Sequence, residues 1–307
     1  MKGLNEERQQ TIRRPVFCEG IGLHSGEPVS VWLRPAAPNS GITFVKQTPA
    51  GAISLEARIN QVSQTRLATS LGQGDRVVHT VEHLLAAVSG MRIDNLVIEL
   101  NASEIPIMDG SSQPFVVAID EAGVVPQRAT RSICTITRPF EVRDGDGWMA
   151  AAPAAGLEIH NTVEYDHPVI GRQVFEYRDE GPSVFAATLA GARTFGFVAD
   201  VEHLKASGYI QGGSLDNAVV VGPMGVVNRE GLRWPDEFVR HKTLDLLGDL
   251  TLLGWPLRGR ISAHKAGHRL HAKFAAYLTS HPECWTVSRA AEAAVEIFEP
   301  AGVLAGK

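Results

Sequence analysis

Residues 79–90 read His79-Thr80-Val81-Glu82-His83-Leu84-Leu85-Ala86-Ala87-Val88-Ser89-Gly90. The apolar run of leucine, alanine and valine, followed by a glycine suited to the position after a helix, predicts a helix over residues 79–89. Such a helix would carry two imidazoles and a carboxylate close to one another. Imidazole is a common zinc ligand, and a carboxylate beside the metal can accept a proton from water. The stretch therefore predicts a helix that bears a metal site.

The spacing of His79, Glu82 and His83 also matches the H-x-x-E-H pattern of one class of metallopeptidases. In that class both histidines would be ligands, and a distant glutamate would be the third. A further alternative is a non-catalytic protein, in which zinc is structural or the polar side chains form a paired network in the core. The motif alone leaves these alternatives open.

Length, charge and cysteine content exclude several classes of protein. A chain of 307 residues can bury a substantial core and favours two domains over one. The net charge of -5, with acidic and basic residues interspersed, provides no basic surface for nucleic acid. Cys18, Cys134 and Cys284 are odd in number and far apart, which indicates a reducing compartment. The polar start of the chain and the lack of a long apolar run predict a cytoplasmic protein without a transmembrane segment.

The order of predicted elements favours an α+β fold. Strand-like alternation precedes the 79–89 helix, and neither half shows regular β-α-β alternation or a glycine-rich phosphate loop. Strands resume near residue 133, so we place a boundary between residues 1–126 and residues 127–307. The other predicted strands span 29–33, 42–45, 95–100 and 133–137, and the other predicted helices span 115–122, 198–207, 236–253 and 267–278.

The predicted helix over residues 236–253 carries a second polar constellation. His241, Asp245 and Asp249 follow at four-residue spacing and form one stripe, whereas most of the remaining surface of the helix is apolar. Burying such a stripe costs several kcal/mol unless each group is paired or bound to a cation. With His83, two of these side chains would supply two nitrogens and one oxygen, which leaves a fourth tetrahedral position open, as in a catalytic zinc site.

Five motifs together resemble a known family. They are Thr80-Val81-Glu82-His83-Leu84, Ile105-Pro106-Ile107-Met108-Asp109-Gly110-Ser111, Ala192-Arg193-Thr194-Phe195-Gly196-Phe197, Phe238-Val239-Arg240-His241-Lys242-Thr243-Leu244-Asp245, and Ser262 through Gly267-His268. In this order they resemble the zinc-dependent UDP-3-O-acyl-N-acetylglucosamine deacetylases of lipid A biosynthesis. The likeness runs from about Gly20 to Leu278.

The resemblance implies a fold, a reaction and a cofactor. The fold would be two similar domains, each a β-sheet layered against helices in a β-α-α-β sandwich, with the active site at their interface. The reaction would be hydrolysis of a linear amide, which removes acetate from UDP-3-O-acyl-N-acetylglucosamine in the committed step of lipid A biosynthesis. The cofactor would be one catalytic Zn²⁺ bound by His83, His241 and Asp245.

The resemblance also implies roles in catalysis. Glu82 would be the general base and His268 the general acid, and separate acid and base groups predict a bell-shaped pH profile. Asp249 would favour the imidazolium form of His268. The hydroxyl of Thr194 would help to stabilise the oxyanion.

Substrate contacts follow from the same resemblance. Lys242 and Lys265 would suit the diphosphate as point charges, and Tyr165 would lie near the nucleotide. An insert at about residues 195–213, which includes Phe195 and Gly213, would form an apolar passage for the acyl chain. We expect a monomer in the cytoplasm of a Gram-negative bacterium, with a nucleotide-sugar substrate and no nucleic-acid partner.

Two positions depart from the family pattern. Relatives often carry lysine before the tryptophan that matches Trp148, where this chain has Gly147. They usually have a small hydroxyl residue at the position of His79. We therefore interpret the H-x-x-E-H match as fortuitous and expect His79 to take no part in the chemistry.

Overall fold

Alternating apolar side chains build the first sheet. In β3 (Pro28–Pro35) the side chains of Val29, Val31 and Leu33 are buried, whereas Trp32 between them is 39% exposed. A strand with this alternation turns one face to the core and the other to solvent. The sheet has the order β2-β3-β8-β4-β5, with β2 at Val16–Ile21, β8 at Leu96–Leu100, β4 at Ile42–Thr48 and β5 at Gly51–Glu56.

The second sheet has seven strands among the residues that the structure describes and is built around β18 (Leu257–His264). This strand pairs antiparallel with β12 and parallel with both β13 and β10. β18 is buried at alternate positions, as expected for a strand with one face toward the core. The remaining strands are β10 (Ser132–Ile136), β11 (Phe140–Asp144), β12 (Gly147–Ala152), β13 (Leu157–Glu164), β14 (Arg172–Arg178) and β19 (Trp285–Arg289).

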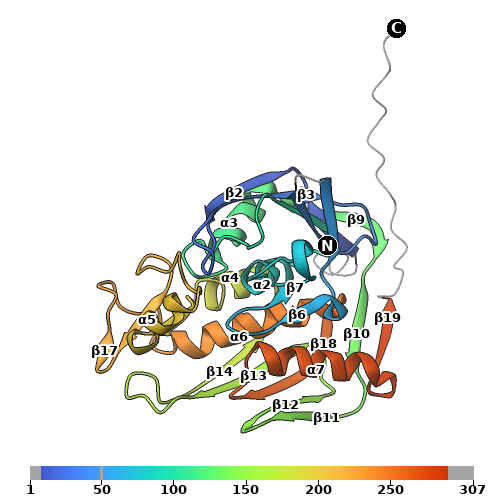
Figure 1. Cartoon of the computed structure of the whole chain (residues 1–307). Helices are drawn as coiled ribbons and strands as arrows, with labels where there is room; N and C mark the ends of the chain where they lie inside the picture. Colours follow the sequence, from blue (N-terminus) through green and yellow to red (C-terminus); the bar gives the residue numbers. More distant parts are fainter. Residues whose placement is uncertain (1–7, 49–50, 290–307) are drawn as a thin grey trace.

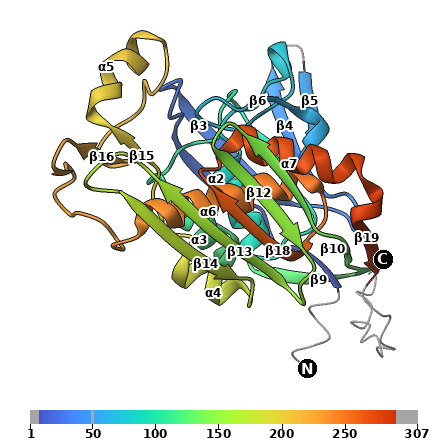
Figure 2. The same cartoon turned by 90° about the horizontal axis from the view of Figure 1, so that it is seen from below.

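Helices lie between these two sheets in the computed structural model, which describes residues 8–48 and 51–289 (Figure 1). Seen from below, the second sheet crosses in front of α6 and α7, and α5 protrudes at one side (Figure 2). The α-helices of the described residues are α2 (Glu82–Gly90), α3 (Gln113–Ala122), α4 (Pro182–Thr188), α5 (Val198–Ala206), α6 (Glu237–Leu250) and α7 (His268–Ser280).

Short elements complete the described part of the chain. The small sheets pair β1 (Arg8–Ile12) with β9 (Val124–Thr130), β6 (Val62–Gln64) with β7 (Ser70–Leu71), and β16 (Val219–Gly222) with β15 (Phe195–Phe197) and β17 (Gly225–Val226). The 3-10 turns are η1 (Ile59–Gln61), η2 (Gly74–Arg76), η3 (Thr251–Leu253) and η4 (Pro282–Cys284).

The helices α2 and α6 pack closely against each other at the centre of the molecule. Gly248 of α6 lies directly against the backbone of Glu82, so a Cβ at this position would collide with the Glu82 carbonyl oxygen. At Gly90 the close neighbour is a side chain instead, because a Cβ there would meet the ring of Phe185. Glycine is the residue that allows two backbones to come this near.

Gly248→Ala is expected to destabilise the protein although alanine favours helix. The gain in helix propensity is about 1 kcal/mol, whereas overpacking against a backbone that cannot swing away costs about 1–3 kcal/mol. We expect a net loss of up to about 2 kcal/mol in urea unfolding and a lower turnover, because the clash displaces Glu82. Gly156→Ala is the control, since a Cβ there meets nothing within 4 Å. Equal stability of the two variants would contradict the close helix contact.

The predicted start of the first helix is wrong. α2 begins at Glu82 rather than at His79. The backbone N–H of His79 donates to Ser103 and its carbonyl accepts from Ile105, so His79 belongs to a strand-like bridge. Thr80 then turns the chain with a φ of 59°. His79 and His83 therefore do not share a helix face.

The other predictions agree with the structure to different degrees. The predicted helices over 115–122, 198–207, 236–253 and 267–278 are confirmed within a few residues, and the mixed architecture is compatible with the α+β class. Gly90 is the last residue of α2 and has no positive φ, so the prediction that it follows the helix is wrong. No pattern in the sequence predicted the helix α4 or the hairpin of β13 and β14.

The division into residues 1–126 and 127–307 stays a prediction. Its boundary falls inside β9, which pairs with β1, and residues 1–7 and 290–307 lie outside the described residues. All three cysteines are buried and free of disulfides. Within residues 8–48 and 51–289, no helix combines the length and the hydropathy needed to cross a membrane.

Candidate active site

A cavity of about 380 Å³ opens at the N-terminal ends of α2 and α7. Its walls come from both halves of the chain, because the first half provides α2 and the second provides α6 and α7. Most of the predicted site residues line it, namely Glu82, His83, Thr194, Phe195, His241, Lys242, Asp245, Lys265 and His268. The structure thus brings together residues that are up to 186 positions apart in the sequence, from Glu82 to His268.

Three buried side chains in this cavity are arranged to hold a metal ion. Nε2 of His83 lies 3.5 Å from Oδ1 of Asp245, and Nε2 of His241 lies 3.3 Å from the same oxygen. Ligand atoms of the three residues lie within 4.8 Å of one another. The Asp245 oxygen is buried without a hydrogen-bond partner in the described part of the chain. A buried carboxylate oxygen left in this state favours a bound cation.

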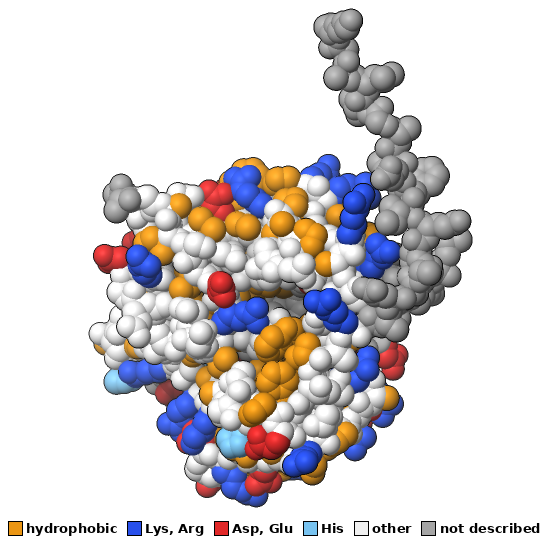
Figure 3. Space-filling view, turned by 90° about the vertical axis from the view of Figure 1, so that its right-hand side faces the viewer, with side chains coloured by type: hydrophobic (Ala, Val, Ile, Leu, Met, Phe, Trp, Pro, Cys, Tyr) orange, Lys and Arg blue, Asp and Glu red, His pale blue; other side chains and the backbone are white. Residues whose placement is uncertain are grey.

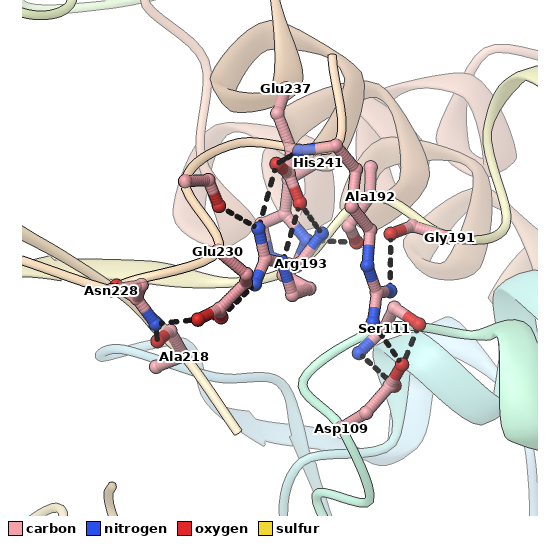
Figure 4. A network of polar contacts seen from close by, with 12 residues as sticks. Asp109, Ser111, Gly191, Ala192, Arg193, Ala218, Asn228, Glu230, Glu237 and His241 are labelled. Atoms are coloured by element: carbon pink, nitrogen blue, oxygen red, sulfur yellow. Dashed lines mark hydrogen bonds and ion pairs between the residues drawn. The ribbon is translucent and has the colours of Figure 1, made fainter. Parts of the chain in front are cut away.

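The orientation of His241 suits metal binding. Its Nδ1 donates a hydrogen bond to the carbonyl of Ala192 at 3.1 Å, so Nε2 keeps its lone pair free (Figure 4). Burial lowers the pKa of His241 to about 3, which keeps the ring neutral at pH 7. A neutral imidazole whose other nitrogen is hydrogen-bonded is the form that coordinates metals.

Lys242, whose side chain is 21% exposed, pairs with the buried Asp245 beside this group, with Nζ 3.1 Å from Oδ2. Burial opposes the charged form of both side chains. The carboxylate nevertheless raises the pKa of Lys242, and the adjacent His241 and Lys242 side chains hold the pKa of Asp245 well below its usual range. Asp245 is therefore ionised and available as an anionic ligand.

Glu82 is held as a candidate base at the first residue of α2. The backbone N–H of Thr69 donates to its Oε2 at 3.0 Å, and its Oε1 lies 3.8 Å from Nε2 of His268. Burial raises the pKa of Glu82, although His268 opposes this effect. A carboxylate of raised pKa is a stronger proton acceptor than an exposed one.

His268 faces Glu82 as a candidate acid. It is the first residue of α7, where the helix dipole and burial both disfavour a cation. Asp249 outweighs these effects, because its Oδ2 accepts from Nδ1 of His268 at 2.8 Å. As a result the pKa of His268 rises to about 9 and, with burial again opposing, that of Asp249 falls to about 2. The geometry thus provides an imidazolium opposite a carboxylate.

Two residues that support Asp249 were missed by sequence reasoning. His271 donates from Nδ1 to the same Oδ2 at 2.8 Å, and the hydroxyl of Thr69 donates to Oδ1 at 2.6 Å. Burial lowers the pKa of His271, so it acts as a neutral donor. The H-x-x-H spacing of His268 and His271 could have indicated the first contact. Thr69 lies in a loop of the first half, and no pattern in the sequence around it indicates its contact with Asp249.

Strained backbone surrounds the cavity. Leu67, Thr80 and Lys265 have positive φ angles of 65°, 59° and 49°, and all three line the cavity. Non-glycine residues in this conformation persist only where the surrounding structure holds them, and they gather at functional sites. Thr80 is held by a hydrogen bond of 3.0 Å to Glu104.

Of three further residues that were predicted to contact the substrate, one lines the cavity and two do not. Lys265 is exposed at the edge of the cavity and pairs with Glu164 at 3.2 Å. Tyr165 does not line the cavity, and its ring packs edge-on against Phe195 with centroids 5.7 Å apart. Gly213 also lies outside the lining, in a turn closed by a hydrogen bond to Ile210.

His79 lies apart from the candidate metal ligands. Its Nδ1 is 2.7 Å from the hydroxyl of Ser70, and it lines a different cavity, together with Glu104. Among the described residues, the candidate metal groups do not include it. The arrangement required for an inverted-motif metallopeptidase is therefore not formed.

Another cavity, of about 260 Å³, lies at the C-terminal ends of α2 and α6. Figure 3 views the molecule from the right-hand side of Figure 1, where Lys and Arg side chains flank a hollow with apolar side chains beside it. The two acidic residues of this cavity, Asp94 and Asp179, pair with Arg131 and Arg92. Its lining contains no histidine or cysteine.

Known proteins are similar to this chain over most of its length. A family model described as UDP-3-O-acyl N-acetylglycosamine deacetylase matches residues 9–280. A UDP-3-O-acyl-N-acetylglucosamine deacetylase of Oleidesulfovibrio alaskensis is 46% identical over 277 residues, which cover 90% of each chain. A protein of the same name from Myxococcus xanthus is 46% identical over 91% of this chain and 88% of its own. Another, from Histophilus somni, is 40% identical over 91% of this chain and 92% of its own.

Proposed function

Because the chain belongs to the UDP-3-O-acyl N-acetylglycosamine deacetylase family, it hydrolyses the acetamide of UDP-3-O-acyl-N-acetylglucosamine in lipid A biosynthesis, and we propose that it does so with one zinc ion held by His83, His241 and Asp245. One observation carries this proposal: two Nε2 atoms converge on a buried carboxylate oxygen that lacks a hydrogen-bond partner in the described structure. Two nitrogens and one oxygen match a catalytic zinc site, which keeps a further position open.

Glu82 is the proposed general base. Zinc bound at this site would lower the pKa of water from 15.7 toward about 7 and polarise the substrate carbonyl. Glu82 borders the same cavity next to His83, so its carboxylate can accept the proton of a water that attacks the acetamide. The hydrogen bond from Thr69 fixes one carboxylate oxygen, and the other faces His268.

His268 is the proposed general acid. Its Nε2 faces the cavity, whereas its Nδ1 is bound to Asp249. The proton on Nε2 can therefore pass to the amine nitrogen as the carbon–nitrogen bond breaks, and the cationic ring stabilises the oxyanion that precedes it. Thr194 lines the same cavity, and its hydroxyl is the second proposed donor to that oxyanion.

We also propose residues that contact the substrate, some of which line the cavity. Lys242 and Lys265 line it and would bind the diphosphate. Phe195 begins the insert of about residues 195–213, which includes Gly213 and would hold the acyl chain. Support for a passage here is that none of the residues of α5 is buried, so the segment is free to cover a ligand. Tyr165, packed on Phe195, would lie near the nucleotide.

The setting that we propose agrees with these assignments. The two sheets with their helices would be two similar domains with the site at their interface. The protein would act as a monomer in the cytoplasm of a Gram-negative bacterium.

The pH dependence of kcat/KM is expected to be bell-shaped. Activity needs Glu82 without its proton, so burial of this carboxyl moves the acidic limb upward. Activity also needs protonated His268, so the rate falls as the pH rises through about 9. Asp249→Asn removes the charge that raises the pKa of His268, and the alkaline limb should shift to lower pH. Profiles of the two proteins at equal metal content test this. An alkaline limb that does not move would contradict the pairing of Asp249 with His268.

The reaction itself can be tested with the purified protein. It should release acetate and a free amine from UDP-3-O-acyl-N-acetylglucosamine, and substrates of several acyl lengths would show which chain the insert accepts. Mass spectrometry detects both products. A chelator should abolish the reaction, and substoichiometric zinc should restore it. Activity that survives prolonged chelation would contradict a catalytic metal.

A further inference from the structure

Three consecutive carbonyl groups before Arg193 are each held by a hydrogen bond. The carbonyl of Ala190 accepts from the backbone N–H of Ser112 at 2.9 Å. Gly191 accepts from Nη1 of Arg233 at 2.8 Å, and Ala192 accepts from His241 at 3.1 Å. The last of these bonds sets the direction of the proposed metal ligand, so whatever fixes residues 190–192 also fixes His241.

A buried carboxylate holds the residues that flank this segment (Figure 4). Glu237 is fully buried. Its Oε1 accepts from the backbone N–H and Nε of Arg193, at 3.0 and 2.8 Å. Its Oε2 accepts from Nη2 of Arg193 at 3.2 Å and from the backbone N–H of Arg233 at 2.6 Å. Glu237 is the first residue of α6 and lies one helical turn before His241. It therefore connects the start of α6 to residues 190–192, whose last carbonyl orients His241.

The same segment connects to the ligand from the first half of the chain. Ser112, whose N–H holds Ala190, donates from its hydroxyl to the carbonyl of His83 at 2.6 Å. Arg233, which holds Gly191, also pairs with Asp109 at 2.9 Å. Residues 190–192 are therefore linked to both proposed histidine ligands, to His83 through Ser112 and to His241 directly. The two histidines come from different halves of the chain.

We propose that Arg193, Arg233 and Glu237 are positioning residues for the metal site and together form a carbonyl clamp. The clamp holds the Ala192 carbonyl where it fixes the tautomer and direction of His241, and it sets the separation of His241 from His83. This inference rests on the ligand roles proposed above. Partners that orient a ligand histidine commonly change metal affinity by roughly 10- to 100-fold when they are removed.

A purely structural ion pair would behave differently. Breaking a buried pair lowers stability wherever it lies, but it lowers metal affinity only if it orients a ligand. Arg131 and Asp94 form a suitable control pair, at 2.7 Å with side chains 10% and 11% exposed. They line the cavity at the C-terminal ends of α2 and α6, whereas the metal group lies at the N-terminal end of α2.

Glu237→Gln is the main test variant. Both carboxylate oxygens accept from N–H groups, so either orientation of the amide places its NH₂ group against two donors. We expect zinc affinity, measured without substrate by competition with a chelator, to fall by roughly 10- to 100-fold. Asp94→Asn should leave zinc affinity unchanged even if its apo form melts at a lower temperature. The absorption spectrum of the Co²⁺-substituted protein should change only in the clamp variant.

Arg233→Gln decides the outcome if Glu237→Gln does not fold. The Arg233 side chain is 38% exposed, so its replacement disturbs the core less than replacement of the buried Glu237. Its expected effect has the same direction. Unchanged zinc affinity and an unchanged Co²⁺ spectrum in a folded clamp variant would overturn the proposal, as would an equal loss of affinity in Asp94→Asn. His241→Ala separates this failure from that of the metal site itself. If His241→Ala also retained full affinity, the ligand assignment rather than the clamp would be wrong.

Discussion

Replacing Glu82 with alanine is expected to lower kcat by about two to four orders of magnitude while the metal stays bound. Glu82 borders the cavity beside the three proposed ligands but is not one of them, since neither candidate metal group of the described residues, His83–His241–Asp245 or Asp249–His268–His271, includes it. The variant should therefore lose proton transfer and keep its coordination. Steady-state rates and the metal content of the same preparation, measured by atomic absorption, check both expectations.

Glu82→Gln separates proton transfer from packing. Glutamine keeps the shape of the side chain and can still accept the hydrogen bond from Thr69, but it cannot take up a proton at neutral pH. Both variants should be slow if Glu82 is the base. Near-normal turnover in Glu82→Gln would mean that the carboxylate only supports the structure, and loss of metal in either variant would make Glu82 a ligand.

His241→Ala is expected to remove both the metal and the activity. The substitution leaves one imidazole, that of His83, and one carboxylate, that of Asp245, among the proposed ligands. Two ligands hold zinc far more weakly than the three of a catalytic site. Metal content after dialysis and the rate of acetate release should both fall to background.

His79→Ala is the matched control for this loss. It removes an imidazole from the same part of the sequence, but His79 bonds to Ser70 in a different cavity. We expect normal metal content and near-normal turnover. Metal lost from His79→Ala but retained in His241→Ala would favour the inverted-motif metallopeptidase instead.

The site could be predicted best where side-chain periodicity within one element determines it. His241, Asp245 and Asp249 follow the repeat of a single helix, so their common face is a property of the local sequence. The approach of His83 to this stripe depends on how α2 packs on α6. Ligand chemistry suggested that pairing and the family resemblance implied it, whereas the spacing in the sequence does not contain it.

Non-local backbone contacts explain the parts that the sequence did not predict. His79 continued a helical pattern, but hydrogen bonds to Ser103 and Ile105 draw it into a bridge. Thr69 reaches Asp249 from a loop 180 residues away, and nothing near it in the sequence indicates this contact. The clamp is a similar case. Its charged residues, Arg193, Arg233 and Glu237, resemble ordinary surface residues in the sequence, which does not indicate that they meet.

The central claim is that the metal site exists only where the two halves of the chain meet. Crystals grown with zinc, measured by anomalous diffraction at the zinc edge, test it most directly. We expect one strong peak about 2.0–2.1 Å from Nε2 of both His83 and His241, with a carboxylate oxygen of Asp245 at a similar distance. A peak bound to His79, or no peak between α2 and α6 in protein that is active and loaded with zinc, would contradict the claim.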